Sequence, residues 1–107
     1  MNILFVCSKN KWRSRTAETL FQSDQRHKVR SAGTENDARI RITEKLINWA
    51  DLIFVMEKRH KERLEEKYGM LLGRKQVIIL DIQDEYKYMD TELIEMLRAS
   101  VSTYLDK

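Results

Sequence analysis

A chain of 107 residues is long enough for one domain with a single core, and a hydrophobic fraction of 42% excludes a disordered chain. Its one cysteine excludes an internal disulfide and suits a reducing cytoplasm. No apolar run is long enough to cross a membrane, and Lys9 falls where the apolar core of a signal peptide would continue. The net charge of +3 favours anionic partners in general but is too small to indicate nucleic acid. We therefore expect residues 1–107 to form a single cytoplasmic domain.

The first half of the chain alternates between short apolar stretches and helical patterns. The predicted elements are, in chain order, a strand at 3–6, a helix at 14–23, a strand at 28–32 and a helix at 43–49. Gly33 is expected to stop the second strand, and the Thr43 side chain can cap the second helix.

The second half continues this alternation. Its predicted elements are a strand at 52–56, a highly charged helix at 58–68, a strand at 77–80 and a final helix for which Asp90 is a suitable N-cap. Gly69 and Gly73 are expected to mark the end of the charged helix and the following turn. Residues 58–61, Lys-Arg-His-Lys, are balanced by neighbouring glutamates. We therefore interpret this run, His60 included, as a solvated helix face.

Strands that are apolar throughout and alternate with helices indicate an α/β fold. The predicted fold is a four-stranded parallel sheet with helices on both faces. In such sheets the ligand site lies beyond the carboxyl ends of the strands. The loop after the first strand and the loop at 81–90 both follow strands, so both are expected to reach that end.

The loop after the first strand begins with Cys7 and, after five intervening residues, ends with Arg13. A loop between a strand and a helix can point successive backbone N–H groups at one anion. Arg13 adds a planar fork for two phosphoryl oxygens, and the positive field favours the Cys7 thiolate, which can attack phosphorus. Ser14 is placed to donate a hydrogen bond to the sulfur, and Asn10 is suited to a left-handed backbone conformation. The pattern predicts a cysteine-dependent phosphatase site with a phosphate-binding loop.

Phosphoryl transfer through cysteine also needs an acid for the leaving oxygen and then a base for water. The candidate carboxylates lie in residues 81–86, Asp-Ile-Gln-Asp-Glu-Tyr. Such an acidic run is by itself most often a solvated loop, and a lone cysteine at a strand end is most often a small buried apolar residue. The strand, the five-residue gap, the arginine and the helix in register favour the functional interpretation.

The chain resembles the low-molecular-weight protein tyrosine phosphatases in four motifs. The family's Val-Cys-x-x-Asn-x-x-Arg-Ser-x-x-Ala-Glu stands at 6–18, its Ser-Ala-Gly-Thr at 31–34 and its Ala-Asp-x-Ile-x-x-Met at 50–56. Its acid loop, usually Ile-Pro-Asp-Pro-Tyr, matches Ile82-Gln83-Asp84-Glu85-Tyr86. The motifs occur in the family's order and cover nearly the whole chain.

The resemblance implies that Cys7 is the nucleophile, Arg13 the phosphate clamp and Asp84 the general acid, with Asp81 the less favoured acid. The other loop and mouth residues implied to bind substrate or support the loop are Ser8, Lys9, Asn10, Lys11, Trp12, Ser14 and Tyr86. No metal and no cofactor are implied. The implied substrate is a phosphorylated protein or a small phosphomonoester, with inorganic phosphate as product and no membrane partner.

Departures from the family pattern bear on the substrate. Lys9 stands where the family usually has glycine, Lys11 where it has an apolar residue, and the segment between Thr34 and Ala50 is shorter than usual. Trp12 replaces a second loop cysteine. The resemblance therefore implies a shallow, basic mouth and leaves open whether phosphotyrosine is preferred.

Three other functions fit the pattern less well. An arsenate reductase shares the loop but passes a disulfide along further cysteines, and a sugar-phosphotransferase subunit would need neither Arg13 nor Asp84. The main alternative is an anion- or nucleic-acid-binding module without turnover, in which basic loop residues bind phosphates and Trp12 stacks on a base. Metal binding is not expected, because His27 and His60 show no ligand-like spacing.

Overall fold

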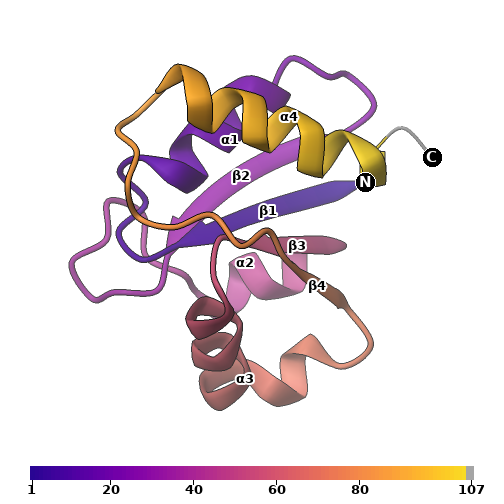
Figure 1. The fold of residues 1–107 in the computed structure, drawn as a ribbon. Coiled ribbons are helices and arrows are strands. Elements are labelled where there is room, and N and C mark those ends of the chain that lie inside the picture. Colours follow the sequence, from indigo (N-terminus) through magenta and orange to yellow (C-terminus); the bar gives the residue numbers. More distant parts are fainter. Residues whose placement is uncertain (106–107) are drawn as a thin grey trace.

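The computed structural model describes residues 1–105, which form four strands and four helices (Figure 1). In chain order these are β1 Asn2–Cys7, α1 Arg13–Phe21, β2 Lys28–Gly33, α2 Glu44–Trp49, β3 Leu52–Val55, α3 Lys58–Leu72, β4 Gln76–Ile79 and α4 Thr91–Leu105. The alternation of strands and helices predicted from the hydrophobic pattern is confirmed.

The four strands form one parallel sheet in the order β2-β1-β3-β4. β1 lies between β2 and β3, with Cys7 opposite Gly33 and Val6 opposite Val55. The chain moves from β1 to one side of the sheet and later to the other, so the strand order reverses at β1. A ligand crevice is expected at the carboxyl ends of the strands at such a point. Cys7 is the last residue of β1 and lies there.

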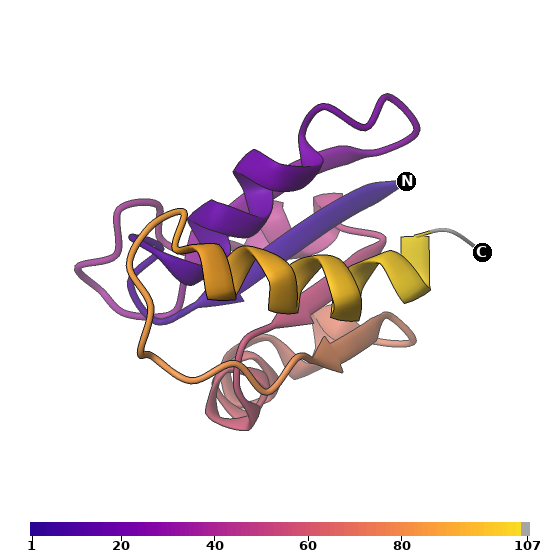
Figure 2. The ribbon, with the colours of Figure 1, turned by 45° about the horizontal axis from the view of Figure 1, so that its top comes forward.

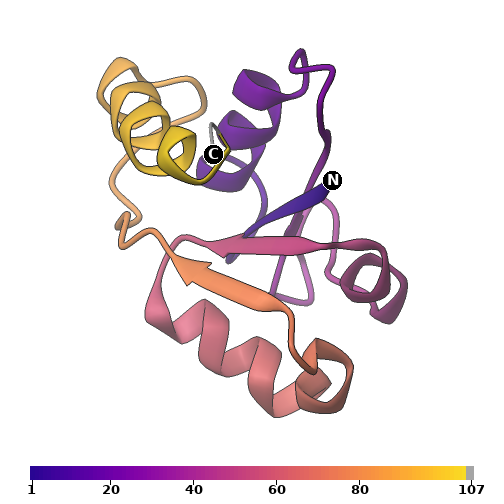
Figure 3. The same cartoon turned by 90° about the vertical axis from the view of Figure 1, so that its right-hand side faces the viewer.

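The helices cover both faces of the sheet, α1 and α4 on one side and α2 and α3 on the other (Figures 1 and 3). Successive residues of β1 point to opposite faces. Ile3 and Phe5 join the core cluster under α1 and α4, whereas Leu4 and Val6 join the cluster under α2 and α3. Figure 2 looks onto α4, which lies beside α1 over the sheet. The predicted fold class is confirmed.

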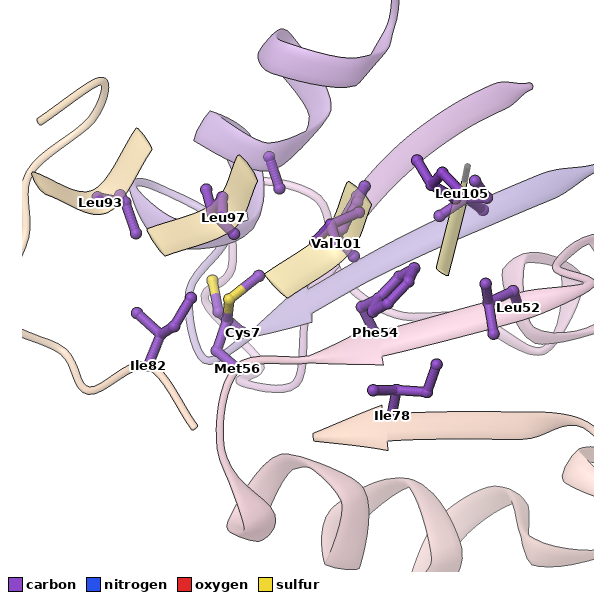
Figure 4. Close-up of a cluster of buried hydrophobic side chains, with 13 residues drawn as sticks. Cys7, Leu52, Phe54, Met56, Ile78, Ile82, Leu93, Leu97, Val101 and Leu105 are labelled. Carbon is purple, nitrogen blue, oxygen red and sulfur yellow. The ribbon is translucent and has the colours of Figure 1, made fainter. Parts of the chain in front are cut away.

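The core cluster under α4 extends to the carboxyl ends of the strands (Figure 4). The apolar side of α4 packs on strand residues such as Phe54. At one end of this cluster Cys7, Met56 and Ile82 lie close together. The cysteine is therefore placed where the apolar core ends and the loops begin.

The predicted helix caps are confirmed. The Thr43 side chain accepts a hydrogen bond from the backbone N–H of Leu46, and Asp90 Oδ1 accepts from the backbone N–H groups of Glu92 and Leu93. These side chains satisfy donors that a helix leaves unpaired in its first turn.

The helical geometry predicted to end at Gly69 is interrupted at Tyr68, and a second helical stretch follows. The helix passes through Gly69 with a local kink at Tyr68, where φ is −130°, and ends at Leu72. Gly73 follows with a φ of +49°, a conformation that favours glycine. α3 and α4 each contain 15 residues, and no helix within residues 1–105 is long and apolar enough to cross a membrane.

Candidate active site

The loop between β1 and α1 is held from outside by the chain that follows β2. The carbonyl oxygens of Cys7, Ser8 and Lys9 accept hydrogen bonds from the backbone N–H groups of Thr34, Glu35 and Arg39, at 2.9 to 3.0 Å. Because these carbonyl oxygens face outward, the loop can present N–H groups inward, as an anion site requires.

Gly33 allows the two chain segments to approach this closely. A Cβ atom at Gly33 would lie 2.5 Å from the Ser8 carbonyl oxygen and 2.9 Å from the Lys9 carbonyl carbon, distances that side chains do not occupy. Both obstacles are backbone atoms, so neither can rotate away. The glycine in the Ser-Ala-Gly-Thr motif is thus required by the close contact with the loop.

The sulfur of Cys7 is surrounded by hydrogen-bond donors. The backbone N–H of Asn10 donates to Sγ at 3.3 Å, and the Ser14 hydroxyl lies 2.9 Å from Sγ. The Asn10 amide Nδ2 donates to Ser14 Oγ at 2.7 Å, so the serine hydroxyl is left to donate its own proton to the sulfur. Asn10 has a φ of +57°, which confirms the left-handed conformation predicted for it. Such donors stabilise a negative charge on sulfur.

Arg13 is fixed by a carboxylate and a carbonyl. Its side chain is only 2% exposed, and Nη1 donates to Glu57 Oε2 at 2.6 Å and to the Ile82 carbonyl oxygen at 2.8 Å. Burial opposes the charge on Glu57, but the hydrogen bonds from Arg59 and Arg13 outweigh it and lower the pKa of the Glu57 carboxyl. A charged Glu57 thus orients a guanidinium whose other nitrogens can bind an anion.

A cavity of about 410 Å³ opens beside the sulfur. The residues that line it come from the loop, the start of α3 and the chain after β4, and they are Cys7, Ser8, Lys9, Lys11, Trp12, Arg13, Glu35, Arg59 and Asp84. A phosphoryl group bound here would lie against the sulfur and the arginine. The remaining volume can hold the group that carries it.

Asp84 is the predicted acid that the structure brings to this cavity. Its Oδ1 lies 3.8 Å from Arg13 Nε, and its side chain is 54% exposed. Asp81 is also exposed, has a φ of +59° and is absent from the residues that line the cavity. The geometry thus favours Asp84 over Asp81.

Three of the predicted substrate-binding residues lie outside the cavity lining. Asn10 and Ser14 are buried beneath the loop around the sulfur. Tyr86 is half-buried against the core cluster under α4, and its hydroxyl donates to the Met96 sulfur at 3.8 Å. Packing its ring against that core draws it away from the cavity. A contact between Tyr86 and substrate therefore stays a prediction without support from this arrangement.

Sequence reasoning missed Glu57 and misplaced His60. Glu57 follows β3, whose carboxyl end lies next to that of β1, so the rule used for the other strand ends could have found it. The interpretation of His60 as part of a solvated face is wrong, because His60 is 1% exposed and its Nε2 lies 2.9 Å from Ser8 Oγ. Within residues 1–105, no group of three or more His, Cys, Asp or Glu side chains is arranged to hold a metal ion.

Comparison with known proteins finds a family model that matches the first part of the chain. The model of the family described as "Low molecular weight phosphotyrosine protein phosphatase" matches residues 2–49, which contain the loop, Gly33 and the segment behind the loop. The fold of the whole chain agrees with that of solved members. This chain is thus similar to the low molecular weight phosphotyrosine protein phosphatases over residues 2–49, and its whole length has their fold.

Solved structures are similar to this chain over its full length. A YwlE mutant from Bacillus subtilis is 27% identical, with a TM-score of 0.73 and coverage of 100% of this chain and 99% of its own. A C7S mutant of YwlE arginine phosphatase with a phosphorylated active site serine is 26% identical, with a TM-score of 0.76 and coverage of 100% and 97%.

The tyrosine phosphatase Wzb from Escherichia coli K30, solved in complex with phosphate, shares the fold at 22% identity. Its TM-score is 0.79, and the match covers 98% of this chain and 96% of that one. No curated protein matches the sequence. The protein is a cysteine-dependent phosphatase with a fold that needs no metal ion.

Proposed function

We propose that the protein hydrolyses the phosphotyrosine of phosphorylated proteins, with Cys7 as nucleophile, Arg13 as phosphate clamp and Asp84 as general acid and base. The observation that carries this assignment is the cavity in which the sulfur, the Arg13 guanidinium and the Asp84 carboxyl meet. The sulfur has two hydrogen-bond donors beneath it, Asn10 and Ser14, which suit a thiolate.

In the first step the Cys7 thiolate attacks phosphorus while the bond from phosphorus to the ester oxygen breaks. Asp84 gives its proton to that oxygen, so the leaving group departs as a neutral alcohol or phenol. Arg13 and the inward N–H groups of the loop stabilise the negative charge on the equatorial oxygens. The product is a phosphocysteine.

In the second step water attacks the phosphocysteine. The Asp84 carboxylate takes a proton from that water, and the sulfur–phosphorus bond breaks to release inorganic phosphate and regenerate the thiolate. The sulfur leaves more easily because the Asn10 N–H and the Ser14 O–H stabilise its returning charge. Asp84 ends the cycle protonated, ready for the next substrate.

The residues at the rim of the cavity favour an aryl phosphate substrate that is flanked by acidic residues. Trp12 is 41% exposed at the rim, where its ring can pack on a phenyl group. Lys9 and Lys11 lie beside it, although Lys9 is already paired with Asp37 at 3.3 Å. These charges favour a phosphotyrosine flanked by acidic residues.

Phosphoarginine is the second candidate substrate, because YwlE is named an arginine phosphatase and a YwlE structure is 26% identical over the whole chain. A phosphorylated guanidino group carries its own cationic nitrogens, which Lys9 and Lys11 would repel. Two peptides of one sequence, carrying either phosphotyrosine or phosphoarginine, would separate the candidates. We expect a higher kcat/KM for the phosphotyrosine peptide, and the reverse order would move the assignment to phosphoarginine.

The reaction itself can be tested by the hydrolysis of p-nitrophenyl phosphate. Cys7→Ser should abolish turnover, and Asp84→Asn should lower kcat by about a hundredfold or more. Asp81→Asn is the matched control, because it removes a neighbouring carboxyl that lies outside the cavity lining, and it should leave kcat nearly unchanged. A loss of turnover in the control but not in Asp84→Asn would assign the acid to Asp81.

We also infer that residues 1–107 act as a single phosphatase domain in the cytoplasm. The two core clusters lie on opposite faces of one sheet. Because both clusters share the same strands, the chain cannot be divided into two independent domains. The catalytic thiol has no second cysteine in the chain to protect it, which suits a reducing compartment.

A further inference from the structure

His60 connects the first turn of α3 with the phosphate-binding loop. It lies at the third position of the helix, is 1% exposed, and places Nε2 2.9 Å from the hydroxyl of Ser8. The two residues are 52 positions apart in the sequence. The mechanism above does not use this contact between a buried imidazole and a serine that lines the cavity.

The hydrogen bonds of the ring fix its tautomer. The backbone N–H of Glu57 donates to Nδ1 at 3.0 Å, so Nδ1 accepts and the ring proton must lie on Nε2. Burial, followed by the charges of Arg13 and Arg59, lowers the pKa of His60 to about 4. The ring is therefore neutral at pH 7 and carries its single N–H on the nitrogen that faces Ser8.

The direction of this bond determines what the Ser8 hydroxyl can do. Ser8 Oγ accepts from Nε2–H, so its own proton is left for another acceptor. Within residues 1–105 no second partner of this hydroxyl is found, and Ser8 lines the cavity beside Cys7 and Arg13. The acceptor in reach of that cavity is an oxygen of a bound phosphoryl group.

We propose that His60 is a positioning residue that holds the Ser8 hydroxyl as a hydrogen-bond donor to the phosphoryl group of the substrate. The inference rests on the phosphatase function proposed above and adds a side-chain donor to the backbone N–H groups of the loop. The same helix start also orients Arg13, because Glu57 is the residue that caps α3 together with His60. The first turn of α3 therefore positions two hydrogen-bond donors, the Ser8 hydroxyl and the Arg13 guanidinium, for the same bound anion.

The proposal is tested by the binding of inorganic phosphate and by p-nitrophenyl phosphate kinetics. Ser8→Ala should weaken phosphate binding by about tenfold, because a hydrogen bond to a charged oxygen is lost, and Ser8→Thr should retain most of the affinity. His60→Gln keeps a donor and an acceptor and should weaken binding less than His60→Ala does. His27→Gln changes the other histidine, which does not line the cavity, and should leave phosphate binding unchanged.

The double variant Ser8→Ala/His60→Ala separates positioning from a merely structural role. If His60 acts through Ser8, the double variant should bind phosphate no more weakly than the weaker single variant. Fully additive losses would overturn the proposal, as would unchanged phosphate binding in Ser8→Ala. Phosphate binding can be measured by calorimetry without any turnover. A protein that fails to hydrolyse p-nitrophenyl phosphate would therefore refute the proposed function but leave the His60 proposal to be decided by phosphate binding.

The histidine tautomer gives a measurement on the unaltered protein. The ¹⁵N chemical shifts of the His60 ring at pH 7 should show a protonated Nε2 and a bare Nδ1. A proton on Nδ1 would reverse the bond to Ser8 and overturn the proposal. This readout stays valid even where a His60 variant does not fold.

Discussion

The phosphate-binding loop and the segment that carries Asp84 meet at one cavity but are built very differently. The loop is tied by backbone hydrogen bonds to residues 34–39, and the buried side chains of Asn10 and Ser14 are bonded beneath the sulfur. The chain at 83–85 is exposed, and Asp84 meets the loop at 3.8 Å from Arg13 Nε. The anion site is thus largely preformed, whereas the position of Asp84, the proposed acid, depends on the anchors at either end of its segment.

Those anchors are identifiable. Ile82 is 2% exposed, and its backbone N–H donates to the Met56 carbonyl oxygen at 2.7 Å. At the other end, the Tyr88 hydroxyl lies 2.8 Å from Thr19 Oγ1 on α1, and Arg15 lies over the Tyr88 ring. Phosphate binding and turnover should therefore respond to different substitutions.

Gly33→Ala should have the largest effect, because it pushes two backbone segments apart behind the loop. We expect a loss of phosphate binding and a free energy of unfolding lower by more than about 2 kcal/mol. Calorimetry and urea unfolding measure the two quantities.

Gly69→Ala is its matched control, since a Cβ atom there meets nothing within 4 Å. Its stability should be unchanged or raised by up to about 1 kcal/mol, because alanine favours a helix. Equal effects of the two substitutions would show that the loop does not depend on close contact at Gly33.

Ile82→Ala should affect turnover much more than phosphate binding. Removal of a buried side chain costs about 2–4 kcal/mol of stability. The loosened anchor should also lower kcat for p-nitrophenyl phosphate by up to about a hundredfold through misplacement of Asp84. Ile78→Ala, in the same core cluster but on β4, should lose stability without this selective fall in kcat. A parallel fall in both variants would mean that Ile82 acts only through stability.

Acid should destabilise the first turn of α3. The pKa of His60 in the folded protein, about 4, lies below its ordinary 6.5, so between these values the unfolded chain binds a proton that the folded chain does not. Stability should therefore fall by up to about 3 kcal/mol as pH drops from 6.5 to 4. The lowered pKa of Glu57 adds a loss in the same direction as pH falls further below its ordinary 4.5.

Urea unfolding at several pH values measures this loss. In His60→Gln the fall above pH 4.5 should be much smaller than in the unaltered protein. An equally steep fall in that variant would assign the acid sensitivity to other groups.

Tyr88→Phe should have the smallest effect. It removes one exposed hydroxyl contact, so stability should change by about 0.5 kcal/mol and kcat by less than about twofold. Steady-state kinetics measure this directly. A large fall in kcat with unchanged phosphate binding would show that the second anchor, rather than Ile82, positions Asp84.

Local sequence patterns predicted the parts of the molecule that local physics determines. The buried strands, the caps at Thr43 and Asp90 and the left-handed Asn10 follow from residue types and their neighbours. The loop between Cys7 and Arg13 could be placed because one strand, one gap and one helix are contiguous in the chain.

The remaining features depend on contacts between distant segments. His60 lies in a run of charges that is typical of a solvated face, and only the packing of the first turn of α3 against the loop makes it a buried partner of Ser8. Tyr86 follows the predicted acid, but its ring joins the core under α4.

The bonds behind the phosphate-binding loop come mostly from the main chain of residues 34–39, and the Arg39 side chain adds one from Nε to the Asn10 carbonyl oxygen at 3.0 Å. Apart from Gly33, whose contact is steric, and Arg39, this support therefore depends little on which side chains the segment bears. Substitutions at Glu35, which lines the cavity, or at Asp37, which pairs with the lining residue Lys9, could therefore change which phosphorylated molecules enter. The phosphate-binding loop itself would keep its shape through such changes, so the substrate specificity could change while Cys7 and Arg13 stay in place.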